Sequence, residues 1–248
     1  MRSVVLASYQ GEQFIGEQLD SILPQLAPDD EIVVSDDAST DGTLAVIAQR
    51  RDPRIRILAN NTRVGYVANF QRAIDASRGD SIFFSDQDDV WLPNKVSTLD
   101  AAMLSCGCVA SDAIVVDDRF QVLHRSWFEW RGARDFSRLS IYLKPPIIGA
   151  TLACRREYLQ GLLPFPTGVP HDFWLTFNAA CDGKLAVIRT PLILYRRHPN
   201  VLSVTATEQR RSLSTIVAER VRLIGAMLRH RLLRRSHAAG HLDETPQA

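Results

Sequence analysis

Short apolar segments alternate with longer amphipathic ones through the first hundred residues, and this alternation restricts the fold more than any other feature. The strand candidates are short and rich in β-branched or aromatic residues, namely SVVLASY, DEIVVSDD, PRIRILANN and DSIFFSD. Apolar residues recur at helical spacing in the segments between them, GEQFIGEQLDSILPQL, ASTDGTLAVIAQRR and VANFQRAIDASRG. This pattern predicts an α/β fold, with a mostly parallel sheet flanked by helices.

The second half of the chain is less regular than the first. We expect strands in GCVASDAIVVDD and PPIIGATLACRRE, the second leading into a helix, and a helix in VPHDFWLTFNAACDGK. LAVIRTPLILYRRH predicts a pair of short strands, whereas residues 118–146 predict a long irregular stretch. The chain is therefore expected to form one domain over residues 1–205, with halves at 1–100 and 101–205.

A long basic helix is predicted over residues 209–235, inside a C-terminal segment of helix and frayed tail that spans 206–248. The helix carries eight arginines against one glutamate. Its apolar residues form one stripe, at Val217, Val221, Ile224, Leu228 and Leu232. Such a helix can dock on its own domain or on a second subunit, or it can lie on an anionic membrane surface. We expect core docking for its first half, and both docking and membrane contact stay open for its end.

Charge and cysteine content argue against several classes of protein. The net charge is +1, so no overall field favours nucleic acid as a partner. We expect the scattered cysteines to be core thiols in a reducing cytoplasm, at Cys106, Cys108, Cys154 and Cys181. The first apolar run is too short for a signal peptide, and no segment reaches the ~20 apolar residues of a membrane-spanning helix. We therefore expect a cytoplasmic protein, with peripheral contact at the inner face of the cell membrane as an open extension.

Clusters of polar residues follow three of the predicted strands, where each strand ends. They are Ala7-Ser8-Tyr9 after the first strand, Asp36-Asp37 after the second and Asp86-Gln87-Asp88-Asp89 after the fourth. In open α/β sheets, ligands bind outside the carboxyl ends of the strands. Because all three clusters meet at that edge, the sequence predicts a ligand site there.

The DQDD cluster places three carboxylates in four residues, and like charges so close repel one another. A D-x-D motif at a strand end can hold Mg²⁺ or Mn²⁺ through few protein ligands, with water and substrate phosphates completing the shell. A metal bound in this way neutralises a diphosphate leaving group. A solvated acidic turn is the alternative, and we favour the metal–diphosphate interpretation.

The other two clusters have a structural and a ligand-binding interpretation each. A carboxylate at Asp36 or Asp37 can accept a hydrogen bond from N3–H of uracil or thymine, or it can cap the following helix. The loop ASYQGEQF lacks the glycine spacing of a P-loop or a dinucleotide-binding turn. Tyr9 can stack on a base there, or it can simply pack in an ordinary strand-to-helix turn.

The segment GVPHDFW places Asp172 just inside the start of a predicted helix, between His171 and Trp174. The helix N-terminus favours the charged carboxylate, which makes it a weaker base. A nearby diphosphate or partial burial raises the pKa of such a group again. Asp172 is therefore a candidate general base, with helix capping as the alternative.

Taken together, these segments resemble family 2 glycosyltransferases with the GT-A fold. ASYQGEQFIGEQLDSIL, SDDASTDGT, RVGYVANFQRAI, GDSIFFSDQDDVWLPNK and PHDFWLTFNAA occur in the order of that family. The resemblance covers roughly residues 3–200 and is strongest to the bacterial rhamnosyltransferase-like branch that builds surface polysaccharide. It implies that the first half binds a nucleotide and the second half an acceptor. The chain departs from the family pattern at Gln10, where asparagine is usual, and in the ending RRHPNVLSV.

The resemblance also implies roles for individual residues. Those expected to bind nucleotide are Ala7, Ser8, Tyr9, Asp36, Asp37, Arg63, Gly65, Asn69 and Asp86. Those expected to hold Mg²⁺ or Mn²⁺ are Asp88, Asp86 and His198. Asp172 corresponds to the catalytic base. Contacts to the acceptor are expected from Trp127, Trp130, His171 and Trp174, and packing of these aromatic residues against the sheet is the alternative.

The implied reaction is a single displacement that inverts the anomeric centre. Its donor is a UDP- or dTDP-linked sugar, with rhamnose as one candidate, and its acceptor is a saccharide or a lipid-linked glycan. A catalytically silent nucleotide-sugar-binding module is an alternative, against which the complete DQDD motif and Asp172 argue. A sugar nucleotidyltransferase is a weaker alternative, because ASYQGEQF does not provide a glycine-rich phosphate loop.

Overall fold

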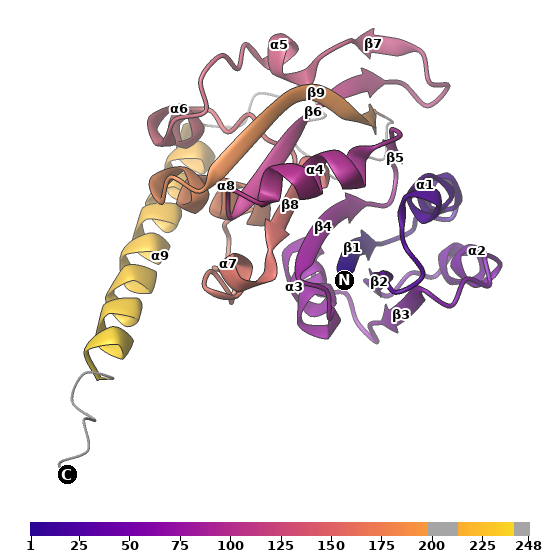
Figure 1. Cartoon of the computed structure of the whole chain (residues 1–248), viewed down its shortest axis with the longest axis horizontal. Coiled ribbons are helices and arrows are strands. Elements are labelled where there is room, and N and C mark those ends of the chain that lie inside the picture. The colour runs from indigo at the N-terminus through magenta and orange to yellow at the C-terminus, as the bar shows by residue number, and fades with distance from the viewer. Residues whose placement is uncertain (198–212, 241–248) are drawn as a thin grey trace.

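A mixed sheet flanked by helices runs through the part of the chain that the computed structural model describes, residues 1–197 and 213–240 (Figure 1). Its first four strands are parallel, and they are β1 (Arg2–Ser8), β2 (Glu31–Asp36), β3 (Ile55–Ala59) and β4 (Ser81–Asp86). They lie in the order β3-β2-β1-β4. The helices that connect them are α1 (Ile15–Ile22), α2 (Thr43–Ala48) and α3 (Tyr66–Ala76). The alternation predicted for the first hundred residues is confirmed.

The second half extends the sheet beyond β4 with both parallel and antiparallel pairs. The strands are β5 (Val90–Trp91), β6 (Cys108–Val116), β7 (Val122–His124), β8 (Leu152–Arg155) and β9 (Leu185–Arg196). β8 is antiparallel to β4 and to β6, whereas β9 is parallel to β6. The helices packed around them include α4 (Lys95–Met103), α7 (Arg156–Gln160) and α8 (His171–Cys181).

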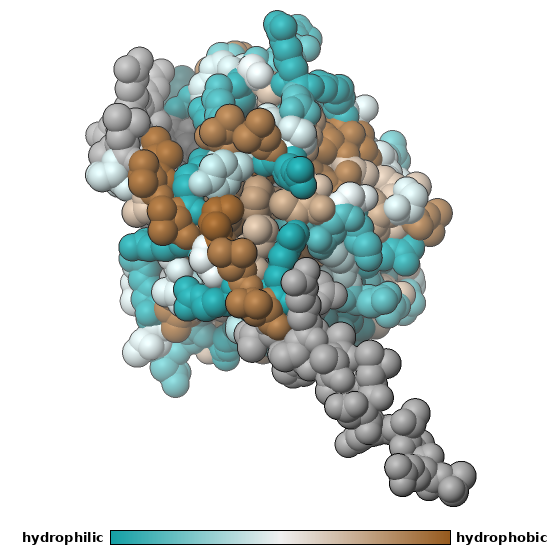
Figure 2. Space-filling view, turned by 90° about the vertical axis from the view of Figure 1, so that its left-hand side faces the viewer, coloured by the Kyte–Doolittle hydropathy of each residue, from teal (hydrophilic) through white to brown (hydrophobic). Residues whose placement is uncertain are grey.

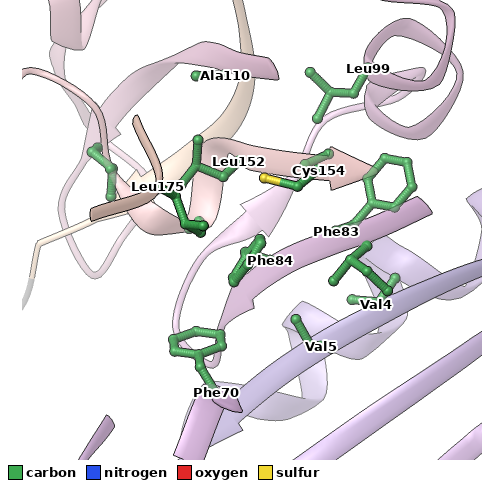
Figure 3. Close-up of a cluster of buried hydrophobic side chains, with 14 of the residues drawn as sticks. Val4, Val5, Phe70, Phe83, Phe84, Leu99, Ala110, Leu152, Cys154 and Leu175 are labelled. Atoms are coloured by element: carbon green, nitrogen blue, oxygen red, sulfur yellow. The ribbon is translucent and has the colours of Figure 1, made fainter. Parts of the chain in front are cut away.

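The hydrophobic core surrounds β1, β2 and β4, whose apolar runs are buried on both faces of the sheet. Val4, Val5, Phe83 and Phe84 are fully buried. Successive side chains of β4 point to opposite faces, so Phe84 packs on Phe70 of α3, with ring centroids 5.7 Å apart, and Phe83 lies on the other side (Figure 3). Continuous burial explains why these strands lack an alternating polar pattern.

Residues 118–146 contain regular elements, so the prediction of an irregular stretch was wrong. Besides β7, this region holds α5 (Trp127–Arg131) and α6 (Arg138–Leu143). The Ser126 hydroxyl accepts a hydrogen bond from the backbone N–H of Glu129 and thereby caps α5. Ser137 caps α6 in the same way through the N–H of Ser140. These caps let very short helices form where apolar periodicity is too brief to detect.

β9 is one strand rather than the predicted pair. Pro191 lies in its middle, and the pairing register with β6 shifts between Ser111 and Asp112, opposite that proline. A proline cannot donate a ladder hydrogen bond, so it occurs in sheets at such irregularities. The break that the sequence indicates is therefore a local shift of register within a continuous strand.

The cysteine prediction was wrong for Cys108 and Cys154, which are joined in a disulfide between β6 and β8. The two residues face each other directly in the antiparallel pairing of these strands. Cys106 and Cys181 are free thiols.

The C-terminal helix α9 (Leu213–Gly240) is present, but it docks differently from the prediction. Leu223 is fully buried and the stripe residue Ile224 packs against the core, whereas the stripe residues Val217, Val221, Leu228 and Leu232 are exposed. The helix therefore docks on the core as expected, but the expectation that it docks through its stripe holds only for Ile224. Residues 209–212 of the predicted helix lie outside the described part of the chain. Within the described residues, no helix combines the length and apolar character needed to cross a membrane.

Candidate active site

The carboxyl ends of β1, β2 and β4 bring the three polar clusters side by side. In the parallel register, Ser8 lies opposite Asp36 of β2, and Ala7 lies opposite Asp86 of β4. Strand β1 is therefore the centre of this edge, with one acidic cluster on each side. The juxtaposition predicted from strand order is confirmed.

Asp36 and Asp37 both have hydrogen-bond partners within the protein. The Asp36 carboxylate accepts bonds from the hydroxyls of Ser8 (2.8 Å) and Ser39 (2.6 Å) and is fully buried. Asp37 accepts bonds from the backbone N–H groups of Val64 (2.7 Å) and Gly65 (2.9 Å). Asp36 thus fixes the turn after β2, while Asp37 holds the loop that enters α3 against the sheet edge.

The loop entering α3 covers the end of β1. The Arg63 guanidinium lies 4.0 Å from the centre of the Tyr9 ring, and Arg63 Nε is 3.9 Å from Asp37 Oδ2. Gly65 immediately precedes α3 with a φ of +87°, a conformation that favours glycine. Asn69 is buried and donates to the carbonyl of Ser35 at 2.6 Å. These contacts join the predicted nucleotide-binding residues into one rim.

Gln87, the middle residue of the D-x-D motif, clamps the end of β4 to the loop after β1. Its Oε1 accepts a bond from the backbone N–H of Tyr9 (2.8 Å), and its Nε2 donates to the Tyr9 carbonyl (3.0 Å). A Cβ atom at Gly11 would clash with Gln87 Oε1, so this position of the Gln87 side chain needs glycine there. The sequence interpretation assigned no role to Gln87 or to Gly11.

Ionisation of Asp86 and Asp89 in the acidic cluster at the end of β4 is unfavourable, because burial and neighbouring carboxylates oppose it. Burial, together with the charges of Asp88 and Asp172, raises the pKa of Asp86 to about 7. Burial and the charges of Asp88 and Asp86 also raise the pKa of Asp89 well above its usual value. Asp89 Oδ1 accepts the backbone N–H of Arg196 at 3.1 Å, but its Oδ2 has no hydrogen-bond partner among the described residues. A cation bound near this cluster would relieve the repulsion.

Lys95 lies buried beside this cluster, at the start of α4. Its Nζ donates to the carbonyl of Ala150 at 2.6 Å and lies 3.8 Å from the centre of the Trp91 ring. Burial lowers the pKa of Lys95 to about 7, although Asp89 and Asp86 act in the opposite direction. Lys95 therefore offsets part of the negative charge. Sequence reasoning missed it, because a lysine next to a loop is normally solvated.

Asp172 lies in the first turn of α8, and its Oδ1 accepts the backbone N–H of Phe173 at 2.8 Å. Its side chain is half-buried, and its charge contributes to the raised pKa of Asp86. The start of α8 and the end of β4 therefore face a common space. The candidate base and the candidate metal ligands, which are distant in sequence, are brought together.

His171 is not placed to contact an acceptor, so that prediction is corrected. Its ring is 3% exposed and lies between Phe70 (centroid distance 4.4 Å) and Phe84 (5.5 Å). Burial lowers the pKa of His171, and neither ring nitrogen has a hydrogen-bond partner among the described residues. Gly149 leaves room for the ring, since a Cβ there would lie 2.7 Å from Nε2 of His171.

Trp127 and Trp174 are also core residues rather than acceptor contacts. Each is 2% exposed and donates its indole N–H to a backbone carbonyl, of Pro146 and Leu162 respectively. Trp130 differs, because it is half-buried and stacks on His124 at a centroid distance of 4.5 Å. Of the predicted acceptor tryptophans, Trp130 alone keeps part of its surface accessible.

The donor set suits a divalent cation that is shared with a phosphate ligand. Among residues 1–197 and 213–240, no three His, Cys, Asp or Glu side chains form a metal site by themselves. Asp86 and Asp88 supply two carboxylates at the rim, and Mg²⁺ is commonly held by one or two carboxylates plus substrate phosphates. His198, the third predicted ligand, lies outside the described residues.

Comparison with known proteins identifies the family. The family model described as Glycosyl transferase family 2 matches residues 3–163, which include β1 to β4, the acidic cluster and β8. The chain belongs to glycosyl transferase family 2. The Asp172 region lies beyond the matched residues, so its role depends on the geometry described above.

Relatives of this family 2 chain come from several bacteria. An uncharacterized protein of Mycobacterium tuberculosis is 28% identical over 84% of this chain and 62% of its own length. The dTDP-rhamnosyl transferase RfbG of Shigella flexneri is 29% identical over 79% of this chain and 72% of its own. The chain thus spans less than two thirds of the length of the mycobacterial relative.

A solved structure confirms the predicted GT-A fold. S. aureus TarS 1–349 in complex with UDP-GlcNAc superposes with a TM-score of 0.66 at 19% identity, over 85% of this chain and 62% of that chain. A mycobacterial protein of known structure gives a TM-score of 0.55 at 23% identity over 93% of this chain.

Proposed function

We propose that this family 2 chain is an inverting glycosyltransferase, which moves a sugar from a nucleoside diphosphate sugar to an acceptor hydroxyl. One observation carries the proposal. His171, the neighbour of Asp172 at the start of α8, stacks on Phe84 of β4 with ring centroids 5.5 Å apart, and the charge of Asp172 helps to raise the pKa of Asp86 at the end of that strand. A leaving-group site and a base site therefore face each other across one sheet edge.

The donor proposed is a UDP- or dTDP-linked sugar. The nucleobase of the donor would bind in the rim formed by Tyr9, Arg63 and the loop that Asp37 holds. Asp86 would lie near the ribose. Support comes from the solved UDP-GlcNAc complex of the structural neighbour and from the name of the relative RfbG, a dTDP-rhamnosyl transferase. Rhamnose is accordingly one candidate for the transferred sugar.

Asp172 is proposed as the general base. Its second carboxylate oxygen would accept the proton of the acceptor hydroxyl as that hydroxyl attacks the anomeric carbon. Asp172 lies in the first turn of α8, where the backbone N–H of Phe173 holds its Oδ1. One displacement with one base inverts the anomeric centre.

Asp88 and Asp86 are proposed to hold Mg²⁺ or Mn²⁺. When bound, the cation would neutralise charge on the departing nucleoside diphosphate. Gln87 keeps the two carboxylates in place through its two bonds to Tyr9, and Lys95 limits the repulsion within the cluster.

The acceptor proposed is a saccharide or a lipid-linked glycan in polysaccharide synthesis, with Trp130 as a candidate stacking surface. The Escherichia coli relative WfgD is 32% identical over 102 residues and is named a UDP-Glc:alpha-D-GlcNAc-diphosphoundecaprenol beta-1,3-glucosyltransferase. A lipid-linked acceptor implies reaction in the cytoplasm, in peripheral contact with the inner face of the cell membrane.

The test is release of nucleoside diphosphate from a panel of UDP-, dTDP- and GDP-sugars, each with Mn²⁺, Mg²⁺ or chelator. We expect release from one donor and its loss with chelator. Donor-dependent thermal stabilisation without release, even after a panel of acceptors is added, would indicate a silent binding module. If the protein shows no nucleoside diphosphate release and no donor-dependent stabilisation, the proposed function is contradicted.

A further inference from the structure

Exposed apolar side chains line one side of α9 and continue onto α6. On α9 they are Val217, Val221, Leu228 and Leu232, each between 54% and 66% exposed. On α6 they are Leu139 and Leu143, which are as exposed as the residues of α9. The two helices are adjacent, because Arg220 Nη2 donates to the Leu143 carbonyl at 3.5 Å. Figure 2 shows this side, where brown side chains run obliquely across the face, with teal side chains beside them.

Helix α9 is held to the domain by its opposite side. Leu223 is fully buried, and the His230 ring meets the Trp174 ring edge-on at 5.8 Å. Residues 217, 221, 224, 228 and 232 are spaced by three or four, so they share one helix face, which Leu223 and His230 do not. Ile224 packs against the core, and the docking of α9 leaves the other four residues of the stripe uncovered.

Arginines border the stripe on both sides. At 100° per residue, Arg222 and Arg229 fall together on one flank, and both are exposed. Arg231 falls on the other flank, half-exposed and 3.7 Å from Asp182. The one acidic residue in the sequence of α9 is Glu219, which is largely buried and lies 3.8 Å from Arg220. The exposed side of α9 is thus apolar along its middle and positive at its edges.

We propose that this basic apolar face, formed by α9 and α6, binds the surface of an anionic lipid membrane. Apolar side chains would enter the boundary between headgroups and acyl chains, and the flanking arginines would meet lipid phosphates. A second copy of the chain fits less well, because two such faces would bring arginines against arginines. The inference extends the membrane contact of the proposed function, but it rests on the exposed face and not on the transfer chemistry.

The test is co-sedimentation of the full chain with vesicles of phosphatidylcholine alone or mixed with phosphatidylglycerol. We expect binding to the anionic vesicles, weakened by salt. Two double variants should each reduce binding by about tenfold or more, Leu228→Ser/Leu232→Ser and Arg222→Gln/Arg229→Gln. Leu104→Ser is the matched control, because Leu104 is 78% exposed at the end of α4 and should not affect binding.

Binding that is equal on neutral vesicles, absent on both, or unchanged by the α9 variants would overturn the inference. A dimer in sedimentation velocity that Leu228→Ser/Leu232→Ser dissociates, without vesicle binding, would assign the face to a second copy instead. Circular dichroism melts check that each variant folds. Nucleoside diphosphate release from a soluble donor, measured on the same samples, separates failure of membrane binding from failure of the proposed transfer.

Discussion

The edge formed by β1, β2 and β4 and the aromatic region around α5 and α8 show how differently two kinds of residue can be predicted. At the sheet edge, the predicted polar residues lie together, because parallel strands end at a common edge whatever else the chain does. Around α5 and α8, Trp127, His171 and Trp174 were expected to contact an acceptor, yet all three are buried. Strand order thus locates polar clusters well, whereas the exposure of an aromatic residue depends on packing between distant segments.

The largest expected effect is at the sheet edge, with Asp88→Asn. If Asp88 holds the cation, donor release should fall about a thousandfold, to the level measured with chelator, since a metal contributes several kcal/mol to such a step. Asp29→Asn removes an exposed carboxylate elsewhere and should leave release unchanged. Full activity in Asp88→Asn would break the link between the acidic cluster and the reaction.

Two tryptophan variants test the assignment of buried and accessible rings in the aromatic region. Trp127→Ala should lower the free energy of unfolding by about 3–5 kcal/mol, because it removes a buried ring from the core. Trp130→Ala should change stability far less and raise the acceptor KM instead. Thermal melts and acceptor titrations measure the two effects, and equal destabilisation by both variants would contradict the assignment of Trp130 as the accessible ring.

Asp37→Asn should have a moderate effect on the rim. The amide that replaces the carboxylate cannot accept hydrogen bonds at both of its terminal atoms, so one of the N–H groups of Val64 and Gly65 loses its partner. Because Val64 is exposed and Gly65 only half-buried, water can replace the lost partner, and the loss should be about 1 kcal/mol, the net contribution of one hydrogen bond. Urea unfolding should show this loss of stability. Nucleotide binding should also be weaker. Unchanged stability would indicate that the loop holds its position without Asp37.

The smallest expected effect is a pH dependence of cation affinity. Because the pKa of Asp86 is raised to about 7, the group takes up a proton below pH 7 and loses the charge that attracts a cation. Mn²⁺ affinity, measured by calorimetry, should therefore fall by up to about tenfold per pH unit below 7. With chelator present, the free energy of unfolding should fall as pH rises from about 4 to 7, because Asp86 ionises at an unfavourable site. Constant affinity from pH 8 to 5 would contradict this account of the cluster.

The strands and the polar edge could be predicted because they depend on local periodicity and on strand order. The disulfide could not, since Cys108 and Cys154 are 46 residues apart and meet only through the register of β6 and β8. The buried position of Lys95 likewise depends on η2 (Gly149–Thr151), which carries the carbonyl of Ala150. By contrast, the S-x-x-E spacing of Ser126 and Glu129 was a readable helix-start signal that was overlooked.

For α9, periodicity revealed a genuine apolar stripe but not the side on which the helix docks. A stripe is normally taken to face the core. Here Leu223 and Ile224 pack on the core and His230 meets Trp174, whereas the other four stripe residues face outward. Which face is buried depends on the surface that the rest of the fold offers, and that information is not local.

The most direct test of the central claim compares donor binding with sugar transfer in Asp172→Asn. Donor affinity, measured by calorimetry with Mg²⁺ or Mn²⁺, should stay within about threefold of the unsubstituted chain, because Asp172 is assigned to the proton and not to the nucleotide. Transfer should fall by about 10²–10⁴, the usual contribution of a general base. Retained transfer in Asp172→Asn would contradict the account.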